Sequence, residues 1–277
     1  MPELPEVETI KRDLKKCLVG QTIEKICVYD QRVIKNLKVE EFIKRLQGLK
    51  ISQINRAGKA IIIEFNPFAA EAGLRPEYLV IQLKMTGHFI LGGEPSKETK
   101  LTLYLLNGQH LHYNDQRIFG RWTLVHDLAQ VPYLKKLGLE PLNGHFSLEW
   151  LKDNLKKKKV PIKTLLMNQE FIAGIGNIYA SEILFASRIH PERKALRLKQ
   201  DEMDLLYQTI IDILKEAVRL RGTSMRNYRD LSGQKGNYHN RMKVYDKEDQ
   251  ACLQCGRAIE RIVQNGRSTF FCRRCQK

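Results

Sequence analysis

The apolar positions at the start of the chain follow a helical repeat. Val7, Ile10, Leu14 and Leu18 are spaced three and four residues apart, which places them on one face of a helix. Pro5 suits the first turn of such a helix, because the backbone N–H that proline lacks would be unpaired there. The pattern therefore predicts an amphipathic helix close to the N-terminus.

Between about residues 22 and 126 the pattern changes to short runs rich in β-branched and aromatic residues, separated by turn signals. Asn107-Gly108 lies between two of these runs and strongly favours a hairpin turn. One short helix, over residues 40–49 and ended by Gly48, interrupts the series. The predicted strands are 60–65, 78–83, 88–91, 101–106, 110–113 and 121–125. Many strands behind an N-terminal helix favour a β-sandwich.

The second half of the chain has a helical pattern. Prolines and glycines mark a linker over residues 132–144, after which Ser147 is suited to cap the first helix. Gly222 ends the last helix. The polar segment 223–240 contains glycine and several basic residues, which predicts a mobile basic loop. The predicted helices are 147–157, 162–168, 177–187 and 200–221.

Composition limits the class of partner. The chain has 277 residues, of which 43% are hydrophobic and 28% are charged, as in ordinary globular proteins with room for two domains. Its net charge of +16 favours a polyanionic partner. The sequence has neither an apolar run of membrane-spanning length nor a hydrophobic signal core. We therefore expect a cytoplasmic protein that binds nucleic acid rather than a membrane.

Four of the six cysteines lie in the last 26 residues and have the spacing of a metal site. Cys252-x2-Cys255 and Cys272-x2-Cys275 are separated by 16 residues, as in zinc ribbons. Four thiolates complete a tetrahedral shell and leave no open position, so we predict one structural Zn²⁺. The residues between the two pairs predict a hairpin that carries Arg267 outward; in isolation this arginine would be an ordinary surface charge.

The candidate nucleophile lies at the N-terminus. Removal of Met1 would leave Pro2 with a free secondary amine, and α-amino groups titrate near ~7.7–8.0, so a fraction is uncharged at neutral pH. Such an amine can attack a sugar aldehyde carbon and form an iminium that remains cationic, which makes it an electron sink for elimination. Glu3 is adjacent and can carry protons. The alternative is that these residues only begin a helix.

Four further features are weak signals by themselves. Residues 174–177, Gly-Ile-Gly-Asn, precede a predicted helix, where glycines and exposed N–H groups suit a phosphate; a plain helix–helix turn is the alternative. Arg117 and Phe119 share one loop and suit a probe of duplex DNA, with an aromatic wedge and a guanidinium against a base edge. Lys59, and the lysine run 156–159 together with Lys163, would otherwise be ordinary solvated lysines.

Taken together in order, these motifs resemble the formamidopyrimidine-DNA glycosylase family over nearly the whole chain. The resemblance rests on the opening Met-Pro-Glu-Leu-Pro-Glu-Val-Glu-Thr, the loop 114–120, the motif around Asn177 and the four cysteines. It implies an α+β protein with an N-terminal catalytic β-sandwich and flanking helices, a helix–two-turn–helix DNA-binding domain and a C-terminal zinc-ribbon hairpin. The implied domain boundaries are 1–131, 132–240 and 241–277.

The resemblance implies a bifunctional DNA glycosylase/AP lyase of base excision repair. Its partner would be damaged double-stranded DNA, from which it would excise oxidised purines such as 8-oxoguanine and formamidopyrimidines before nicking the abasic site by β,δ-elimination. Pro2 would form the Schiff base, Glu3 would act as acid and base, and Lys59 would support base departure and elimination. We expect a monomer in the bacterial cytoplasm that associates with the nucleoid through DNA.

The resemblance also assigns DNA contacts. Asn177 and Arg267 would clamp the phosphate beside the lesion, and Lys158 would touch the DNA backbone. An enzyme that extrudes a base must fill the hole that the base leaves, because unstacking costs a few kcal/mol. The residues expected to fill this void are Met85, Arg117 and Phe119.

The sequence departs from the family pattern at positions that concern affinity and opposite-base preference. Ile118 stands where a second arginine is usual, Gln82 and Lys84 replace a frequent histidine and glycine, and the region 97–100 lacks a DNA-contacting histidine. Two alternatives remain. One is a pyrimidine-directed glycosylase of the endonuclease VIII type, which the Pro-Glu-Leu-Pro-Glu-Val opening disfavours. The other is a non-catalytic zinc-ribbon DNA-binding protein, for which the net charge and the cysteines would suffice.

Overall fold

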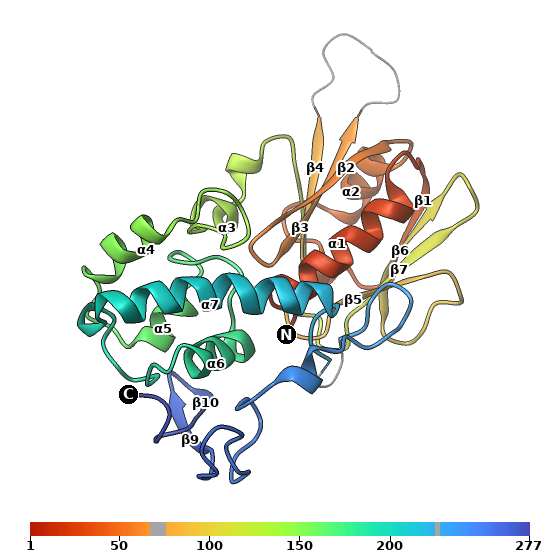
Figure 1. Cartoon of the computed structure of the whole chain (residues 1–277). Coiled ribbons are helices and arrows are strands. Elements are labelled where there is room, and N and C mark those ends of the chain that lie inside the picture. The colour runs from red at the N-terminus through yellow and green to blue at the C-terminus, as the bar shows by residue number, and fades with distance from the viewer. Residues whose placement is uncertain (67–75, 225–227) are drawn as a thin grey trace. The chain divides into compact units, whose positions relative to one another are not determined.

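The computed structural model describes residues 1–66, 76–224 and 228–277. Their contacts divide the chain into two compact units (Figure 1). Unit 1 consists of Met1–Lys135 together with Arg221–Asn237, and unit 2 consists of Lys136–Leu220 together with Tyr238–Lys277. The α+β class is confirmed, whereas the domain boundaries expected at 131/132 and 240/241 stay a prediction.

Unit 1 begins with the predicted amphipathic helix, α1 (Leu4–Leu18). All four of its repeating apolar positions are buried in the main core of the unit. The second helix, α2 (Val39–Leu46), is shorter than predicted, and Gly48 follows it with a φ of +84°, a left-handed conformation that favours glycine.

The strands described in unit 1 form two antiparallel four-stranded sheets. The first has the order β1 (Ile23–Val28), β6 (Thr99–Leu105), β7 (His110–Asn114) and β5 (His88–Leu91). The second has the order β2 (Lys50–Ala57), β3 (Ala60–Asn66), β4 (Glu77–Gln82) and β8 (Arg121–Val125). Buried residues of both sheets and of α1 form one core, so the predicted sandwich is confirmed. All six predicted strands are present, and β1 and β2 are additional.

The predicted hairpin at Asn107-Gly108 connects β6 to β7. Gly108 has a φ of +81°, and its N–H donates to Leu105 O at 2.9 Å. Because this left-handed φ favours glycine, the Asn-Gly pair determines the turn that joins the two strands.

The second sheet is buried on both faces, which explains the uninterrupted apolar run of β3. Its outer face carries Ile62 and Val80, which pack with Val131 and with the partly buried Tyr133. These covering residues lie directly before the predicted linker and at its start, where α3 (Pro132–Lys135) forms a single short turn of helix.

Unit 2 contains the four predicted helices. They are α4 (Leu148–Leu155), α5 (Ile162–Leu166), α6 (Asn177–Ala186) and α7 (Gln200–Arg219). The predicted cap is confirmed, because Ser147 Oγ accepts the N–H of Trp150 at 3.1 Å. The long helix α7 packs against α4 and α6 (Figure 1). In the part of the chain that is described, no helix is both long enough and apolar enough to cross a bilayer.

The predicted C-terminal hairpin consists of β9 (Glu260–Gln264) and β10 (Arg267–Phe271). Its apolar core is small: Ile259 and Phe270 pack with Val244, with Phe185 of α6 and with two of the cysteines. Such a small core is typical of a hairpin that depends on a bound metal.

The segment 223–240, predicted as a mobile loop, is anchored in its described part. Tyr228 and Leu231 are buried in the core of unit 1. The Asp230 carboxylate accepts the backbone N–H groups of Ser232 and Gln234 and the guanidinium of Arg221, at distances of 2.7–3.0 Å. Arg226, one of its expected basic residues, lies outside the described residues.

Candidate functional site

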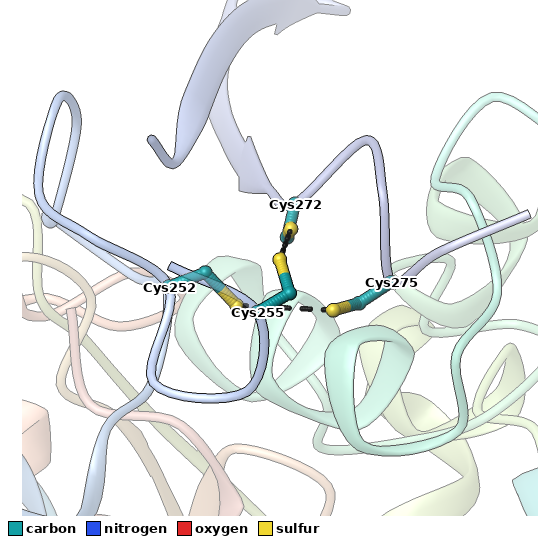
Figure 2. A group of neighbouring side chains, drawn as sticks. All are labelled: Cys252, Cys255, Cys272 and Cys275. Carbon is teal, nitrogen blue, oxygen red and sulfur yellow. Dashed lines mark hydrogen bonds between the residues drawn. The ribbon is translucent and has the colours of Figure 1, made fainter. Parts of the chain in front are cut away.

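The four cysteines at the C-terminus converge on one point (Figure 2). All four Sγ atoms lie within 4.8 Å of one another, with Cys252 and Cys275 3.9 Å apart and Cys255 and Cys272 3.5 Å apart. A tetrahedral site with Zn–S bonds of about 2.3 Å requires sulfur atoms about 3.8 Å apart. The residues therefore fit one zinc ion, and because four thiolates fill its coordination shell, this zinc is structural.

Polar side chains of unit 2 fix the surroundings of the zinc site. Glu182 of α6 accepts the backbone N–H groups of residues 243–245 at 2.7–3.0 Å. Gln276 accepts the N–H of Cys272 at 2.9 Å and donates to Ile189 O at 2.9 Å. The second cysteine pair is therefore held by the loop that follows α6.

Lys163 of α5 is a residue of this site whose burial sequence reasoning missed. Read from the sequence as part of a solvated basic run, it is in fact only 1% exposed. Its Nζ donates to Asn177 Oδ1 and Thr269 Oγ1, each at 2.6 Å, and to Ser268 O at 3.3 Å. Asn177 Nδ2 donates to the same Ser268 O at 2.9 Å. This network joins α5, the first residue of α6 and β10.

The available signal for Lys163 was its position rather than its type. Lys163 directly follows Ile162 and comes shortly before Leu165 and Leu166. The side chains of these three apolar residues are all buried. This apolar setting distinguishes Lys163 from the run 156–159, whose four lysines are all exposed.

Arg267 is exposed at the first position of β10, directly before Ser268. The hydrogen bond of Asn177 to Ser268 O therefore places these two predicted phosphate contacts on adjoining backbone. Lys158 is exposed in the turn after α4, with its Nζ 5.9 Å from the centre of the Phe171 ring. A pocket of about 210 Å³ lies beside Arg267, lined by Lys163, Thr164, Met167, Asn168, Gln264, Asn265 and Arg267.

In unit 1, the N-terminal residues are fixed by their backbone. Pro2 and Glu3 are buried, and Glu3 N donates to Glu6 Oε2 at 2.7 Å, which caps α1. The second oxygen of the Glu6 carboxylate accepts the N–H of Thr223 at 2.7 Å. One buried carboxylate thus holds both the start of α1 and the segment that follows α7.

Lys59 lies in the tight turn between β2 and β3. Gly58 has a φ of +54°, and Lys59 N donates to the hydroxyl of Tyr133 at 3.0 Å. Arg56 connects this turn to the terminal helix, because its Nη1 donates to Gly58 O at 2.8 Å and its Nε donates to Glu8 Oε2 at 3.0 Å. Arg56 therefore connects the backbone of the turn that carries Lys59 to Glu8 of α1.

Burial alone would raise the pKa of the Glu8 carboxyl. Hydrogen bonds from Lys11, Arg12 and Arg56 outweigh that effect, so the pKa is lowered from its ordinary value. Glu8 is consequently ionised at neutral pH and is a permanent partner for Arg56.

Three exposed side chains on two loops of unit 1 form a set that we call the probe residues: Met85, Arg117 and Phe119. Met85 is 41% exposed and Phe119 48% exposed, and the Arg117 guanidinium carbon lies 4.5 Å from the centre of the Phe119 ring. Ile118, between the last two, has a φ of +55° and packs inward against the core. Ile118, which stands where a second arginine is usual in the family, thus packs beneath the loop and supports it.

Comparison with known families defines the class of the protein as a DNA glycosylase of base excision repair that carries a zinc finger. The N-terminal domain model of formamidopyrimidine-DNA glycosylase matches residues 1–122, and the H2TH domain model of the same enzyme matches residues 137–229. The zinc finger found in FPG and IleRS matches residues 249–277. The chain belongs to the formamidopyrimidine-DNA glycosylase family.

Similar proteins extend over the full length of the chain. Formamidopyrimidine-DNA glycosylases of Desulforamulus reducens and Carboxydothermus hydrogenoformans are each 39% identical to it, covering 100% of this chain and 99% and 100% of their own. The crystal structure of the MutM (Fpg) protein of Thermus thermophilus has a TM-score of 0.87 at 37% identity, covering 99% of this chain and 98% of its own. A Lactococcus lactis Fpg complex with DNA containing an abasic site has a TM-score of 0.90 at 36% identity, with 99% of each chain covered.

Proposed function

We propose that this protein excises oxidised purines from damaged double-stranded DNA and then cleaves the abasic site by β,δ-elimination. The observation that carries the proposal is the position of Pro2 and Glu3. Both are buried at the start of α1, and the N–H of Glu3 donates to the Glu6 carboxylate. Solved Lactococcus lactis relatives bind DNA that contains an abasic site or Fapy-dG, which supports the same substrate class here.

The chemistry begins once Met1 has been removed. The Pro2 nitrogen forms a bond to C1′ of the damaged nucleotide while the bond from C1′ to the base breaks, and the base leaves with the bonding electrons and takes up a proton. The proline nitrogen then loses its proton, and the C1′–O4′ bond breaks as O4′ takes up a proton, which gives an iminium between C1′ and the proline nitrogen. Because the amine is secondary, this iminium has no N–H proton to lose and stays cationic.

The cation then serves as the electron sink for strand cleavage. Loss of a proton from C2′ sends electrons into the iminium and gives an enamine, whose electrons then expel the 3′ phosphate and restore a conjugated iminium. Loss of a proton from C4′ expels the 5′ phosphate in the same way. Glu3 gives and takes the protons, and Lys59 assists departure of the base. Water then hydrolyses the iminium, which frees Pro2 and leaves a gap of one nucleoside.

Unit 2 contributes the grip on the DNA backbone. Asn177 and Arg267, on adjoining backbone, bind the phosphate beside the lesion, and Lys158 adds a further phosphate contact. An amide NH₂ carries two protons, of which Asn177 gives one to Ser268 O, so the other can point toward a phosphate. These contacts carry no sequence information and make binding depend on salt.

The probe residues of unit 1 would enter the duplex when the damaged nucleotide is extruded. Phe119 is the aromatic wedge, Arg117 pairs with the edge of the orphaned cytosine, and Met85 fills the remaining space. The guanidinium is held against the ring of Phe119 at 4.5 Å, so wedge and base reader would act together. A monomer and a cytoplasmic location stay predictions.

Trapping with borohydride tests the nucleophile directly. The purified protein is incubated with an 8-oxoguanine:cytosine duplex and borohydride, beside a Pro2→Gly variant and protein that retains Met1. We expect a covalent protein–DNA band that is lost in both controls, because both lack the terminal secondary amine. Intact DNA binding without a band in the wild type would instead indicate a non-catalytic zinc-ribbon protein. Faster cleavage of a thymine-glycol duplex would indicate the pyrimidine-directed branch.

A further inference from the structure

The two loops that carry the probe residues are joined by a buried carboxylate. Asp115 directly follows β7 and is 0% exposed. Its Oδ2 accepts the N–H of Gly120 at 2.7 Å and the hydroxyl of Tyr113 at 3.3 Å, and its Oδ1 accepts the hydroxyl of Thr86 at 2.5 Å. One side chain therefore reaches the turn after β4 and both ends of the loop between β7 and β8.

The Thr86 hydroxyl extends this connection to the probe residues themselves. While it donates to Asp115, the same oxygen accepts the backbone N–H of Arg117 at 3.0 Å. Thr86 is the neighbour of Met85 in the chain. A single hydroxyl thus sets the distance between the backbone that carries Met85 and the backbone that carries Arg117.

The two loops close tightly over Tyr113. A Cβ atom added at Gly87 would lie 2.4 Å from the tyrosine hydroxyl oxygen, and one added at Gly120 would lie 1.8 Å from it. Burial, reinforced by the charge of Asp115, raises the pKa of Tyr113, so the hydroxyl keeps its proton and remains a donor. The loops therefore meet over Tyr113 with no spare volume at these two glycines.

We propose that Asp115 is a positioning residue that holds the three probe residues as one rigid unit before DNA is bound. The proposal rests on the proposed role of these residues in filling the void. A wedge that is already ordered does not have to lose conformational entropy when it enters the base stack. Asp115 therefore acts on insertion and on discrimination of the opposite base, and not on the bond-breaking steps at Pro2.

The sharpest test removes the hydroxyl that connects the two loops. Thr86→Val keeps the shape of the side chain but loses its donor and acceptor, and Thr86→Ser restores them. The probe is a duplex with a tetrahydrofuran abasic analogue opposite a fluorescent cytosine analogue, whose emission reports insertion by stopped flow. We expect insertion about tenfold slower in Thr86→Val and Asp115→Asn, and near the wild-type rate in Thr86→Ser.

A matched control separates this role from general stability. Thr102→Val makes the same substitution at a fully buried threonine of the same unit, whose hydroxyl bonds His112 at 2.8 Å, away from both loops. Its thermal stability should fall while insertion stays within about twofold of the wild type. A loss of insertion in Thr102→Val that matches Thr86→Val would overturn the proposal.

Two activity measurements complete the test. Cleavage of an abasic site in a single-stranded oligonucleotide has no opposite base to read, so Thr86→Val should retain it within about twofold. The preference for cytosine over adenine opposite 8-oxoguanine should fall about tenfold. An unchanged insertion rate and an unchanged opposite-base preference in Thr86→Val and Asp115→Asn would refute the positioning role of Asp115. A wild-type protein that inserts normally but forms no borohydride adduct would refute the proposed lyase and leave the role of Asp115 intact.

Discussion

A single carboxylate, Glu8, connects helix α1 to the turn that carries Lys59. Its oxygens accept the side chains of Arg56 at 3.0 Å, Lys11 at 2.9 Å and Arg12 at 2.8 Å. Because Arg56 also donates to the turn backbone, the charge of Glu8 contributes both to folding and to the placement of Lys59.

Replacement of Glu8 by glutamine should therefore lower stability in a pH-dependent way. The pKa of this carboxyl is lowered in the folded state, so its contribution is present above the ordinary carboxyl pKa and is lost as pH falls through the lowered one. We expect Glu8→Gln to cost about 1–2 kcal/mol at neutral pH and much less in acid. Urea unfolding across this pH range measures the difference, with the exposed Glu24→Gln as control. A penalty that did not depend on pH would contradict the charge-based explanation.

The buried ammonium group of Lys163 likewise fixes the position of a single side chain. It orients the Asn177 side chain, and its hydrogen bonds to that amide and to Thr269 are each 2.6 Å long. A methionine at this position keeps most of the volume but leaves the acceptors unpaired.

We expect Lys163→Met to weaken binding to an abasic-analogue duplex by about tenfold. The matched control is Lys215→Met, which makes the same change in charge at an exposed position of α7 and should stay within about twofold. Fluorescence anisotropy at several salt concentrations measures both affinities. Equal losses in the two variants would show that only net charge had been changed.

At the scale of elements, the zinc hairpin determines where Arg267 lies. Its small core includes two of the metal-binding cysteines, and its second strand supplies Ser268 and Thr269 to the Lys163 network. Loss of the metal should therefore release β10 and Arg267 together, because metal binding supplies the folding free energy of such a hairpin.

Removal of one ligand tests this dependence. We expect Cys255→Ser to lose the single zinc ion, measured by atomic absorption, and to lose strand cleavage by at least about 100-fold. The helical circular dichroism of the protein should remain, since the helices of unit 2 have their own core. Full cleavage by a zinc-free protein would refute a positioning role for the metal.

Two strands escaped prediction for a reason that is visible in their register. In β1 the buried residues Ile23 and Ile26 lie three apart, and in β2 so do Ile51 and Ile54. Each strand has an irregularity in pairing, between residues 23 and 25 and between residues 51 and 53. Such a bulge breaks the alternation of two that identifies a strand and replaces it with a helix-like spacing.

At the scale of the whole molecule, local signals were enough for the α+β class, the zinc site and most elements. What they lacked was tertiary contact. The Lys163 network joins α5, α6 and β10, and Asp115 joins two loops of unit 1. The hydrophobic pattern of each element does not indicate which distant element its polar side chains will contact. The grouping of the chain into units is equally non-local, because Arg221–Asn237 belongs to unit 1 although it follows the last helix of unit 2.

Because Arg221–Asn237 belongs to unit 1 but comes late in the chain, it determines when unit 1 can be completed during synthesis. Residues 1–135 leave the ribosome early, yet Tyr228 and Leu231 belong to their core, and Thr223 supplies an N–H to the Glu6 carboxylate beside the terminus. At roughly 5–20 residues per second, the earlier part waits about 5–20 seconds for these late contributions. The growing chain thus produces its N-terminal amine first and finishes the support of that amine almost last.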